Sequence, residues 1–98
     1  MDDRIFEHHG TMFVWHEAKA RENVRKHAVK FEEAATVCDD PLFVMCDASR
    51  NEEERYAVIG LSSAGRLLTV AHLESNGEYI RIISARPASA VEETLYDQ

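Results

Sequence analysis

The chain has 98 residues, of which 45% are hydrophobic and 30% are charged, and its formal net charge at pH 7 is −7. This length suits one domain with a single modest core, and the composition is that of a folded rather than a disordered protein. No apolar run approaches the roughly 20 residues that a membrane helix needs. The excess of acidic residues argues against binding nucleic acid over the whole surface, because such binding depends on neutralising phosphates.

The N-terminal stretch MDDRIFEHHGTM carries acids where a secretion signal would carry lysines, so we expect a cytoplasmic protein. We expect residues 1–12 to be a poorly ordered extension of a single domain that spans residues 1–98. Cys38 and Cys46 fit no metal or redox spacing and are predicted to be reduced thiols in the core. The five histidines lack the tight Cys or His spacing of zinc sites, so neither a metal nor a cofactor is predicted.

The first half of the chain predicts one strand and two helices. Residues 11–15, TMFVW, are rich in aromatic and β-branched side chains and predict a short strand. A helix is expected to follow over residues 16–27. A shorter helix over residues 31–38 should end at the turn signal Asp39-Asp40-Pro41.

The second half predicts strands and then a final helix. Four strand-like runs have short connections, which favour an antiparallel meander, and one connection contains the typical hairpin signal Asn76-Gly77. The last helix is expected to begin at the capping box Ser89-Ala90-Val91-Glu92, where the glutamate also suits the positive end of the helix dipole. The predicted fold is therefore α+β: an antiparallel sheet of four to five strands, two N-terminal helices and one C-terminal helix. The four runs are LFVMCD, RYAVIGLSS, RLLTVAHLE and EYIRIISA.

Charge is distributed unevenly along the chain. Residues 17–30 contain five basic and two acidic side chains, whereas residues 89–98 contain three acidic and no basic ones. This asymmetry indicates a local basic surface on a protein that is acidic as a whole.

Three stretches, WHEAKARENVRKHAVKFEEAATVCDDP, ERYAVIGLSSAGRLL and IRIISARPAS, resemble in that order the three blocks of the BrnT family. The members of that family are the toxin halves of type II toxin–antitoxin pairs, ribonucleases with a RelE-like fold. The resemblance extends from about Phe13 to Tyr96, and its specificity comes from the order and spacing of the blocks. The matching residues are Trp15, Lys19, Asn23, Lys26, His27, Phe31, Glu32, Ala34, Glu54, Arg55, Gly60, Arg81, Ser84, Arg86 and Glu92.

The resemblance implies metal-independent endonucleolytic cleavage of RNA, inhibition of translation, and neutralisation by a BrnA-like ribbon-helix-helix antitoxin. It also implies a hetero-oligomer that contacts operator DNA only through the antitoxin. The alternative is a catalytically weakened relative that serves as an antitoxin-binding regulatory subunit, because the last helix is acidic where relatives are commonly rich in arginine and lysine. His16 and Ala28 also depart from the family's Asp and Gly, and each change should weaken the first long helix by about 1 kcal/mol or less.

Metal-free cleavage of RNA uses the 2′-hydroxyl as the nucleophile, and arginine suits the task of stabilising charge on the phosphoryl oxygens. Arg55, Arg81 and Arg86 are the candidates, and Lys26 is a further possible phosphate contact. Arg81 and Arg86 are five residues apart, so a regular strand would point them to opposite faces. They share a site only if the strand ends or bulges between them. The alternative is that these arginines form surface ion pairs with neighbouring glutamates.

His27 is the candidate for proton transfer, because histidine titrates near neutral pH. It shares a helix face with Ala20 and Val24, so packing near the end of that helix is an equal alternative. Glu92 is predicted to be a helix cap rather than an acid or base. Trp15 and Phe31 resemble the aromatic side chains that stack on RNA bases, but core packing is favoured for both.

Overall fold

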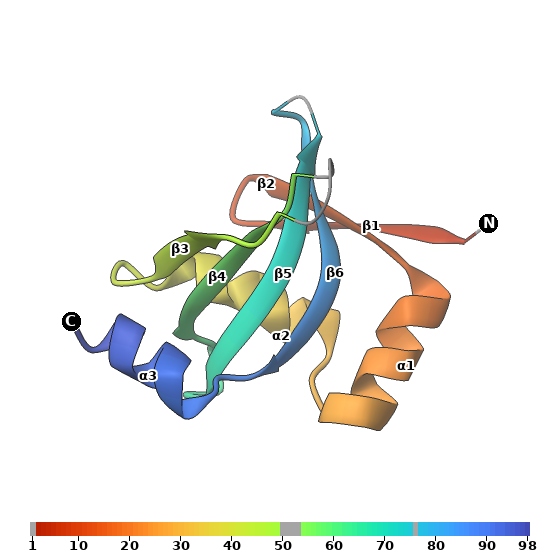
Figure 1. The fold of residues 1–98 in the computed structure, drawn as a ribbon. Helices are drawn as coiled ribbons and strands as arrows, with labels where there is room; N and C mark the ends of the chain where they lie inside the picture. Colours follow the sequence, from red (N-terminus) through yellow and green to blue (C-terminus); the bar gives the residue numbers. More distant parts are fainter. Residues whose placement is uncertain (1, 50–53, 76) are drawn as a thin grey trace.

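Six strands form one mixed sheet in the computed structural model, which describes residues 2–49, 54–75 and 77–98 (Figure 1). The strand order is β1-β2-β6-β5-β4-β3. The strands are β1 (Asp3–His8), β2 (Thr11–His16), β3 (Val44–Asp47), β4 (Tyr56–Leu61), β5 (Leu67–Ser75) and β6 (Tyr79–Pro87). The helices are α1 (Glu17–His27), α2 (Phe31–Ala35), the 3-10 helix η1 (Thr36–Asp39) and α3 (Ala90–Tyr96).

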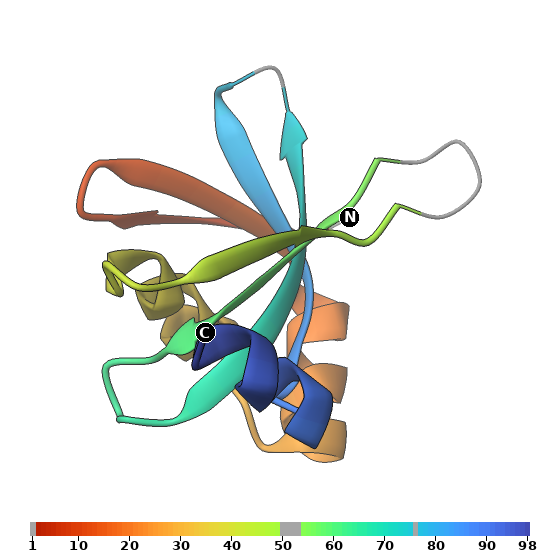
Figure 2. The same ribbon diagram turned by 60° about the vertical axis from the view of Figure 1, so that its left-hand side comes forward.

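The two faces of the sheet are covered by different helices. Helix α2 packs against one face, and the C-terminal helix α3 crosses the opposite face beside β4 and β5 (Figure 2). Helix α1 lies alongside β6. In the described part of the chain, no helix is long and apolar enough to cross a membrane.

An N-terminal hairpin stands where the sequence indicated a poorly ordered extension over residues 1–12. Residues 3–8 form β1, antiparallel to β2, with Phe6 opposite Phe13. The turn residues His9 and Gly10 have φ of 49° and 85°, which is typical of a two-residue type I′ hairpin. The sequence signal is weak because β1 is a charged edge strand, in which Phe6 is the side chain that packs against the core.

The expectation of an antiparallel RelE-like sheet of four to five strands, preceded by two helices, was wrong. The sheet is mixed, because β2 pairs in parallel with β6 through Phe13 opposite Ile80 and Val14 opposite Arg81. A strand hairpin also precedes α1 and α2. The predicted meander of β3, β4, β5 and β6 is confirmed. Local patterns could not predict the parallel pairing, since it joins segments from opposite ends of the chain.

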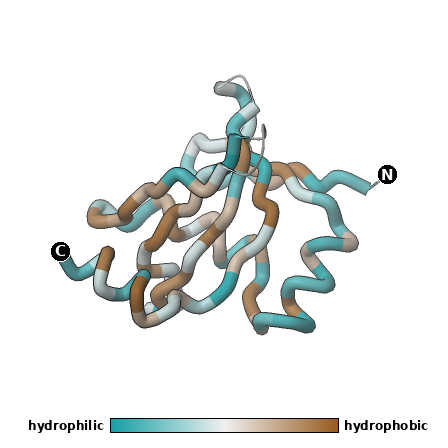
Figure 3. Tube along the Cα trace, viewed as in Figure 1, coloured by the Kyte–Doolittle hydropathy of each residue, from teal (hydrophilic) through white to brown (hydrophobic). Residues whose placement is uncertain are grey.

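The hydrophobic core lies between α2 and the sheet; apolar positions recur along the central strands, whereas α1 is largely hydrophilic (Figure 3). The rings of Trp15 and Phe31 meet edge to face with their centroids 5.7 Å apart, so the packing role predicted for both is confirmed. Burying one such side chain contributes about 1.5–3 kcal/mol. The cysteines lie outside this core, contrary to expectation: Cys38 is exposed and Cys46 half-buried. Other fully buried side chains are Phe13, Val29, Val37, Leu68 and Ile82.

The ends of α1 show the effect of the two family departures. His16 occupies the N-cap position, and its side chain makes no capping hydrogen bond. Ala28 occupies the C-cap position with φ 58° and ψ 34°, a left-handed conformation that costs a residue with a Cβ atom about 1 kcal/mol. The predicted weakening of both helix ends therefore has a structural basis.

Asn23 attaches α1 to the edge of β6. The pairing of β2 with β6 involves the start of β6, so the N–H and C=O groups of Ala85 further along face α1 instead. Asn23 Oδ1 accepts a hydrogen bond from the Ala85 N–H (3.1 Å), and Nδ2 donates to the carbonyl oxygens of Ala85 (2.8 Å) and Val29 (2.9 Å). The amide thus replaces a neighbouring strand, and it holds the C-terminal half of α1 beside β6.

We predict that Asn23→Ala lowers the free energy of unfolding by about 3 kcal/mol, because three buried backbone groups lose their partner. Urea denaturation followed by circular dichroism measures this change. Arg21→Ala, at an exposed position of the same helix, is the control and should change the unfolding free energy by less than about 0.5 kcal/mol. Equal stability of the two variants would contradict the role given to Asn23.

Candidate functional site

A cleft of about 330 Å³ lies on the sheet face that carries α3, and we call it the arginine cleft. Small side chains from three adjacent strands, Ala57, Ala71 and Ser84, leave room above the sheet. Two arginines border this space, so an extended anionic chain can approach the strands closely. The lining residues are Ala48, Arg55, Ala57, Thr69, Ala71, Ser84, Arg86 and Glu92.

A β-bulge in β6 changes the direction of its side chains. His72 pairs with Ile82 and Ala71 pairs with Ser84, so Ile83 is an extra residue without a partner in the register. Ile82 and Ala85 consequently both face the core. Arg81 and Arg86, which adjoin these two core residues in the sequence, therefore both point away from it. The strand is therefore irregular between Arg81 and Arg86, which is the condition that the sequence set for these two arginines to share a site.

Arg81 nevertheless lies outside the arginine cleft. Its Nη2 is 2.9 Å from Asp3 Oδ2 and its Nη1 is 3.4 Å from Asp3 Oδ1, so it pairs with the first strand. The hydrogen bonds from Arg81 lower the pKa of the Asp3 carboxyl group. Both side chains are substantially exposed, and such pairs add little stability. The structure thus brings Arg55 and Arg86 to one cleft and leaves Arg81 with a surface carboxylate.

Arg86 forms a bidentate ion pair with Glu92 at the edge of the cleft. Nη1 donates to Oε1 at 2.7 Å and Nη2 donates to Oε2 at 2.8 Å. This pair was missed from the sequence, because other neighbouring glutamates were considered as partners and Glu92 was treated as part of a helix cap. The sequence did carry a signal for this ion pair: Glu92 follows Arg86 by six positions, across a predicted strand-to-helix loop.

The Glu92 carboxylate also collects hydrogen bonds from two other elements. Its Oε1 accepts from the Ser89 backbone N–H (2.8 Å) and from Thr69 Oγ1 (2.8 Å). The predicted capping box at Ser89 is confirmed. These contacts, led by the hydrogen bonds from Arg86, lower the pKa of Glu92 to about 2, and Glu92 in turn raises the pKa of Arg86. Glu92 therefore fixes α3 to the sheet as a carboxylate.

A second hollow of about 240 Å³ lies between α1 and β6, and we call it the α1 groove. Lys26 and His27 line it, and Lys26 Nζ is 2.8 Å from Glu22 Oε1 in an exposed pair of small energetic value. Ser84 lines both hollows, so the α1 groove adjoins the arginine cleft there. Four of the five predicted site residues thus border two neighbouring hollows. The groove is lined by Lys19, Glu22, Asn23, Lys26, His27, Ile83 and Ser84.

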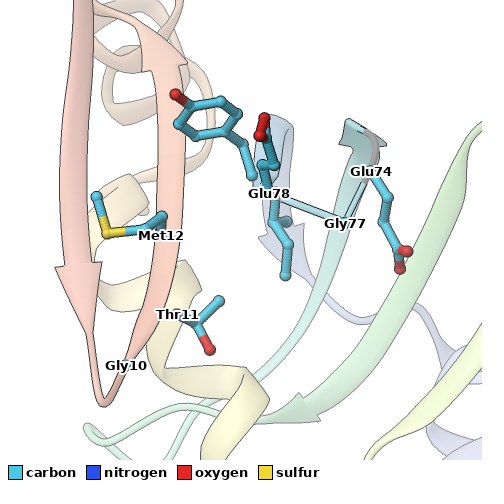
Figure 4. A pocket seen from close by; sticks show the side chains of 8 residues that line it. Gly10, Thr11, Met12, Glu74, Gly77 and Glu78 are labelled. Atoms are coloured by element: carbon cyan, nitrogen blue, oxygen red, sulfur yellow. The ribbon is translucent and has the colours of Figure 1, made fainter.

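A further hollow of about 300 Å³ lies between the β1–β2 turn and the β5–β6 hairpin (Figure 4). Glu74 and Glu78 border it, and the described residues that line it include no lysine or arginine. Two carboxylates without a cation repel a phosphate, so this hollow does not suit an anionic ligand.

Comparison with known proteins identifies the same family that the three sequence blocks resemble. The family model described as "Ribonuclease toxin, BrnT, of type II toxin-antitoxin system" matches residues 15–92, which include the arginine cleft and the α1 groove. A search of curated proteins found no match. Among solved structures, the chain is similar to the Brucella abortus ribonuclease toxin BrnT, with a TM-score of 0.58 and 22% identity. That likeness covers 76% of this chain and 92% of the Brucella chain, and it shows a common fold.

The matched class is that of ribonuclease toxins from type II toxin–antitoxin systems. The chain belongs to the BrnT family, as its three sequence blocks indicated. Membership of a type II system implies an antitoxin as partner.

We predict that Glu92 makes stability depend on pH in the acidic range. Its pKa of about 2 in the folded chain lies below its ordinary value of 4.5, so its stabilising effect is complete above about pH 5 and is lost as the pH falls toward 2. Glu92→Gln should lower the free energy of unfolding at pH 6 by an amount on the order of 2–3 kcal/mol.

Denaturation measures the free energy of unfolding of the wild-type chain and of Glu92→Gln between pH 6 and pH 2.5. The difference between the two values reports Glu92 alone, because the other carboxyl groups contribute equally to both. The difference should shrink as the pH falls. Glu93→Gln, on the exposed side of α3, is the matched control and should follow the wild-type curve. A gap between wild type and Glu92→Gln that is the same at every pH would contradict the assignment.

Proposed function

We propose that this chain is a metal-independent endoribonuclease toxin that inhibits translation and cleaves RNA at the arginine cleft. The observation that carries the proposal is the convergence of Arg55 and Arg86 on a cleft floored by small side chains, within the part of the chain that matches the family. Guanidinium groups bind phosphate in a bidentate manner and stay charged at all relevant pH values. The cleft therefore offers cationic donors to the backbone of an RNA strand.

In the proposed reaction, the 2′-oxygen of the RNA forms a bond to the adjacent phosphorus, and the bond from phosphorus to the 5′-oxygen breaks. Negative charge increases on the phosphoryl oxygens in the transition state. Arg55 and Arg86 would donate hydrogen bonds to these oxygens, a kind of stabilisation worth about 3 kcal/mol per donor. The arginines thus supply the charge compensation that the reaction needs.

His27 and Lys26 would act from the adjoining α1 groove. His27 is the side chain that we propose accepts the proton of the 2′-hydroxyl or returns one to the 5′-oxygen. Lys26 would contact a neighbouring phosphate. Support for both roles comes from their position, since the hollow that they line shares Ser84 with the arginine cleft.

Glu92 has two opposing effects on this site. Its bidentate pair orients the Arg86 guanidinium, but its negative charge repels a phosphate. Because a guanidinium carries five N–H donors, Arg86 can hold Glu92 and still donate to a phosphoryl oxygen. We therefore propose Glu92 as a positioning residue for Arg86.

The same ion pair favours a second candidate function. Glu92 neutralises Arg86, and the acidic α3 beside it lowers the attraction of this face for RNA. A chain with this surface would serve as an antitoxin-binding regulatory subunit with weak catalysis. The two candidates differ in whether the isolated chain cleaves RNA.

We predict that the purified chain cleaves single-stranded RNA in the presence of excess EDTA. Arg86→Ala should lower the rate by about 10²–10³, because one prepositioned donor to the transition state is lost. Arg81→Ala should have a much smaller effect, since Arg81 pairs with Asp3 outside the cleft. Arg21→Ala is the control for loss of a positive charge at an exposed site.

Cleavage that disappears with EDTA and returns with a divalent ion would contradict metal independence. Equal rates for wild type and Arg86→Ala would contradict the site. Inducing the gene alone in bacteria separates the two functions: the nuclease predicts growth arrest that Arg86→Ala abolishes. Unimpaired growth at good expression of folded protein supports the regulatory subunit.

We also propose that the antitoxin is a ribbon-helix-helix protein that covers an apolar surface. Large apolar side chains are exposed on β3 and on the segment before it, at the edge of the sheet, and on α3, which packs on the adjacent β4. Leu42 is 69% exposed and Val91 is 72% exposed, and such groups commonly mark a site of protein contact. The others on these elements are Phe43, Met45 and Leu95.

We predict that co-expression with a ribbon-helix-helix protein encoded beside this chain relieves growth arrest and yields a complex that co-purifies. Met45→Glu should reduce co-purification at least about tenfold, since it buries a charge in the contact. Ile5→Glu, at another exposed apolar position on the far edge of the sheet, is the control. Co-purification that is unchanged by Met45→Glu and lost with Ile5→Glu would place the contact elsewhere.

A further inference from the structure

Two imidazoles and one carboxylate meet at the β1–β2 turn. His8 Nε2 lies 2.6 Å from Asp39 Oδ2, and His9 Nδ1 lies 3.1 Å from Asp39 Oδ1. One potential ligand atom from each residue lies within 4.8 Å of the others. No metal site was predicted from the sequence, because the histidines and cysteines lack the tight spacing of zinc sites. Asp39 is separated from the two histidines by β2, α1 and α2.

The backbone of the turn directs both imidazoles toward the same carboxylate. His9 and Gly10 form the type I′ turn, which brings the end of β1 back along β2. The rings of His8 and His9 stack with their centroids 4.0 Å apart and their planes inclined by 22°. Asp39 ends η1 and faces them from the other side. Two segments of backbone, the β1–β2 hairpin and η1, therefore preorganise the cluster.

We propose that His8, His9 and Asp39 form a binding site for a divalent transition-metal ion of the Zn²⁺ or Co²⁺ type. Imidazole nitrogen and carboxylate oxygen are ligands that these ions prefer, whereas Mg²⁺ and Ca²⁺ prefer oxygen alone. Ligands at about 2.0–2.1 Å in a tetrahedral site are about 3.3 Å apart, so the His9–Asp39 spacing fits. The contact between His8 Nε2 and Asp39 Oδ2 needs to lengthen by less than about 1 Å. The three ligand atoms lie within 4.8 Å of one another, so the widest spacing needs to close by about 1.5 Å at most. The ion takes the place of the protons now shared between these groups.

The site is accessible to an ion and separate from the arginine cleft. The side chains of His9 and Asp39 are 73% and 40% exposed, while His8 is mostly covered. His8 lies on the same side of β1 as Phe6, which packs against the core on the α2 face. The cleft opens on the opposite face, beside α3. A bound ion therefore links the N-terminal hairpin to η1, and three protein ligands leave its fourth position for water or for a group from a partner.

The experiment uses the full chain without an affinity tag, titrated with Co²⁺ and followed by visible absorption, and with Zn²⁺ followed by calorimetry. We expect saturable binding of one ion per chain and a melting temperature several degrees higher with Zn²⁺. His9→Asn and Asp39→Asn should each weaken binding at least about tenfold. Asn is favoured at the positive φ of a type I′ turn, so His9→Asn removes a ligand and keeps the turn.

His27→Gln, which removes a histidine away from the cluster, is the matched control and should bind both ions as the wild type does. Melting temperatures without metal show that each variant is folded. Binding that does not saturate, or that is equally strong in the His9→Asn and Asp39→Asn variants, would overturn the proposal. The cluster would then be a set of hydrogen bonds that holds the hairpin.

Discussion

The Glu92 carboxylate is the interaction on which the candidate site depends. It accepts hydrogen bonds from Thr69 on β5, Arg86 on β6 and the Ser89 N–H at the start of α3. One ionised group thus anchors the first turn of α3 over a sheet that presents small side chains on this face. The same group sets the charge of the cleft, because it occupies part of the guanidinium that we propose binds phosphate. Shape and electrostatics of the site are therefore coupled through one residue.

The positions of Arg86 and of the residues that line the α1 groove follow from two features of β6. Its bulge at Ile83 shifts the alternation of side chains, so that Arg86 points into the cleft while Ala85 still faces the core. Its free edge is completed by the Asn23 amide rather than by β2, which brings α1 beside Ser84. Both features replace regular strand pairing on one strand. The irregularity of β6 therefore brings Arg86 into the cleft and the α1 groove beside it.

Several parts of the fold, and the family, could be predicted from local sequence patterns. Residues 89–92 carry a capping box whose hydrogen bonds are short-range, and the meander follows from short connections between apolar strands. The family could be predicted because its three blocks include buried or anchoring residues such as Asn23, together with Arg86, and because Glu92 also matches just after the third block.

The rest depended on contacts between distant segments. Half of the residues of β1 are charged, so its pattern does not indicate a strand, and the Arg81–Asp3 pair was missed with it. The parallel pairing of β2 with β6 and the meeting of Asp39 with His8 likewise join segments that the sequence separates. These residues become neighbours only in the folded chain, so no local spacing in the sequence could predict their contacts.

The central claim, that RNA contacts the face carrying the arginine cleft, is tested most directly by nuclear magnetic resonance. The ¹⁵N-labelled chain is titrated with an RNA oligonucleotide whose 2′-hydroxyls are methylated, so that it binds without being cleaved. The account predicts that amide shift changes concentrate at Ala57, Ala71, Ser84 and Arg86 and spare the β1–β2 turn. Shift changes that concentrate at that turn, or none at saturating RNA, would contradict it.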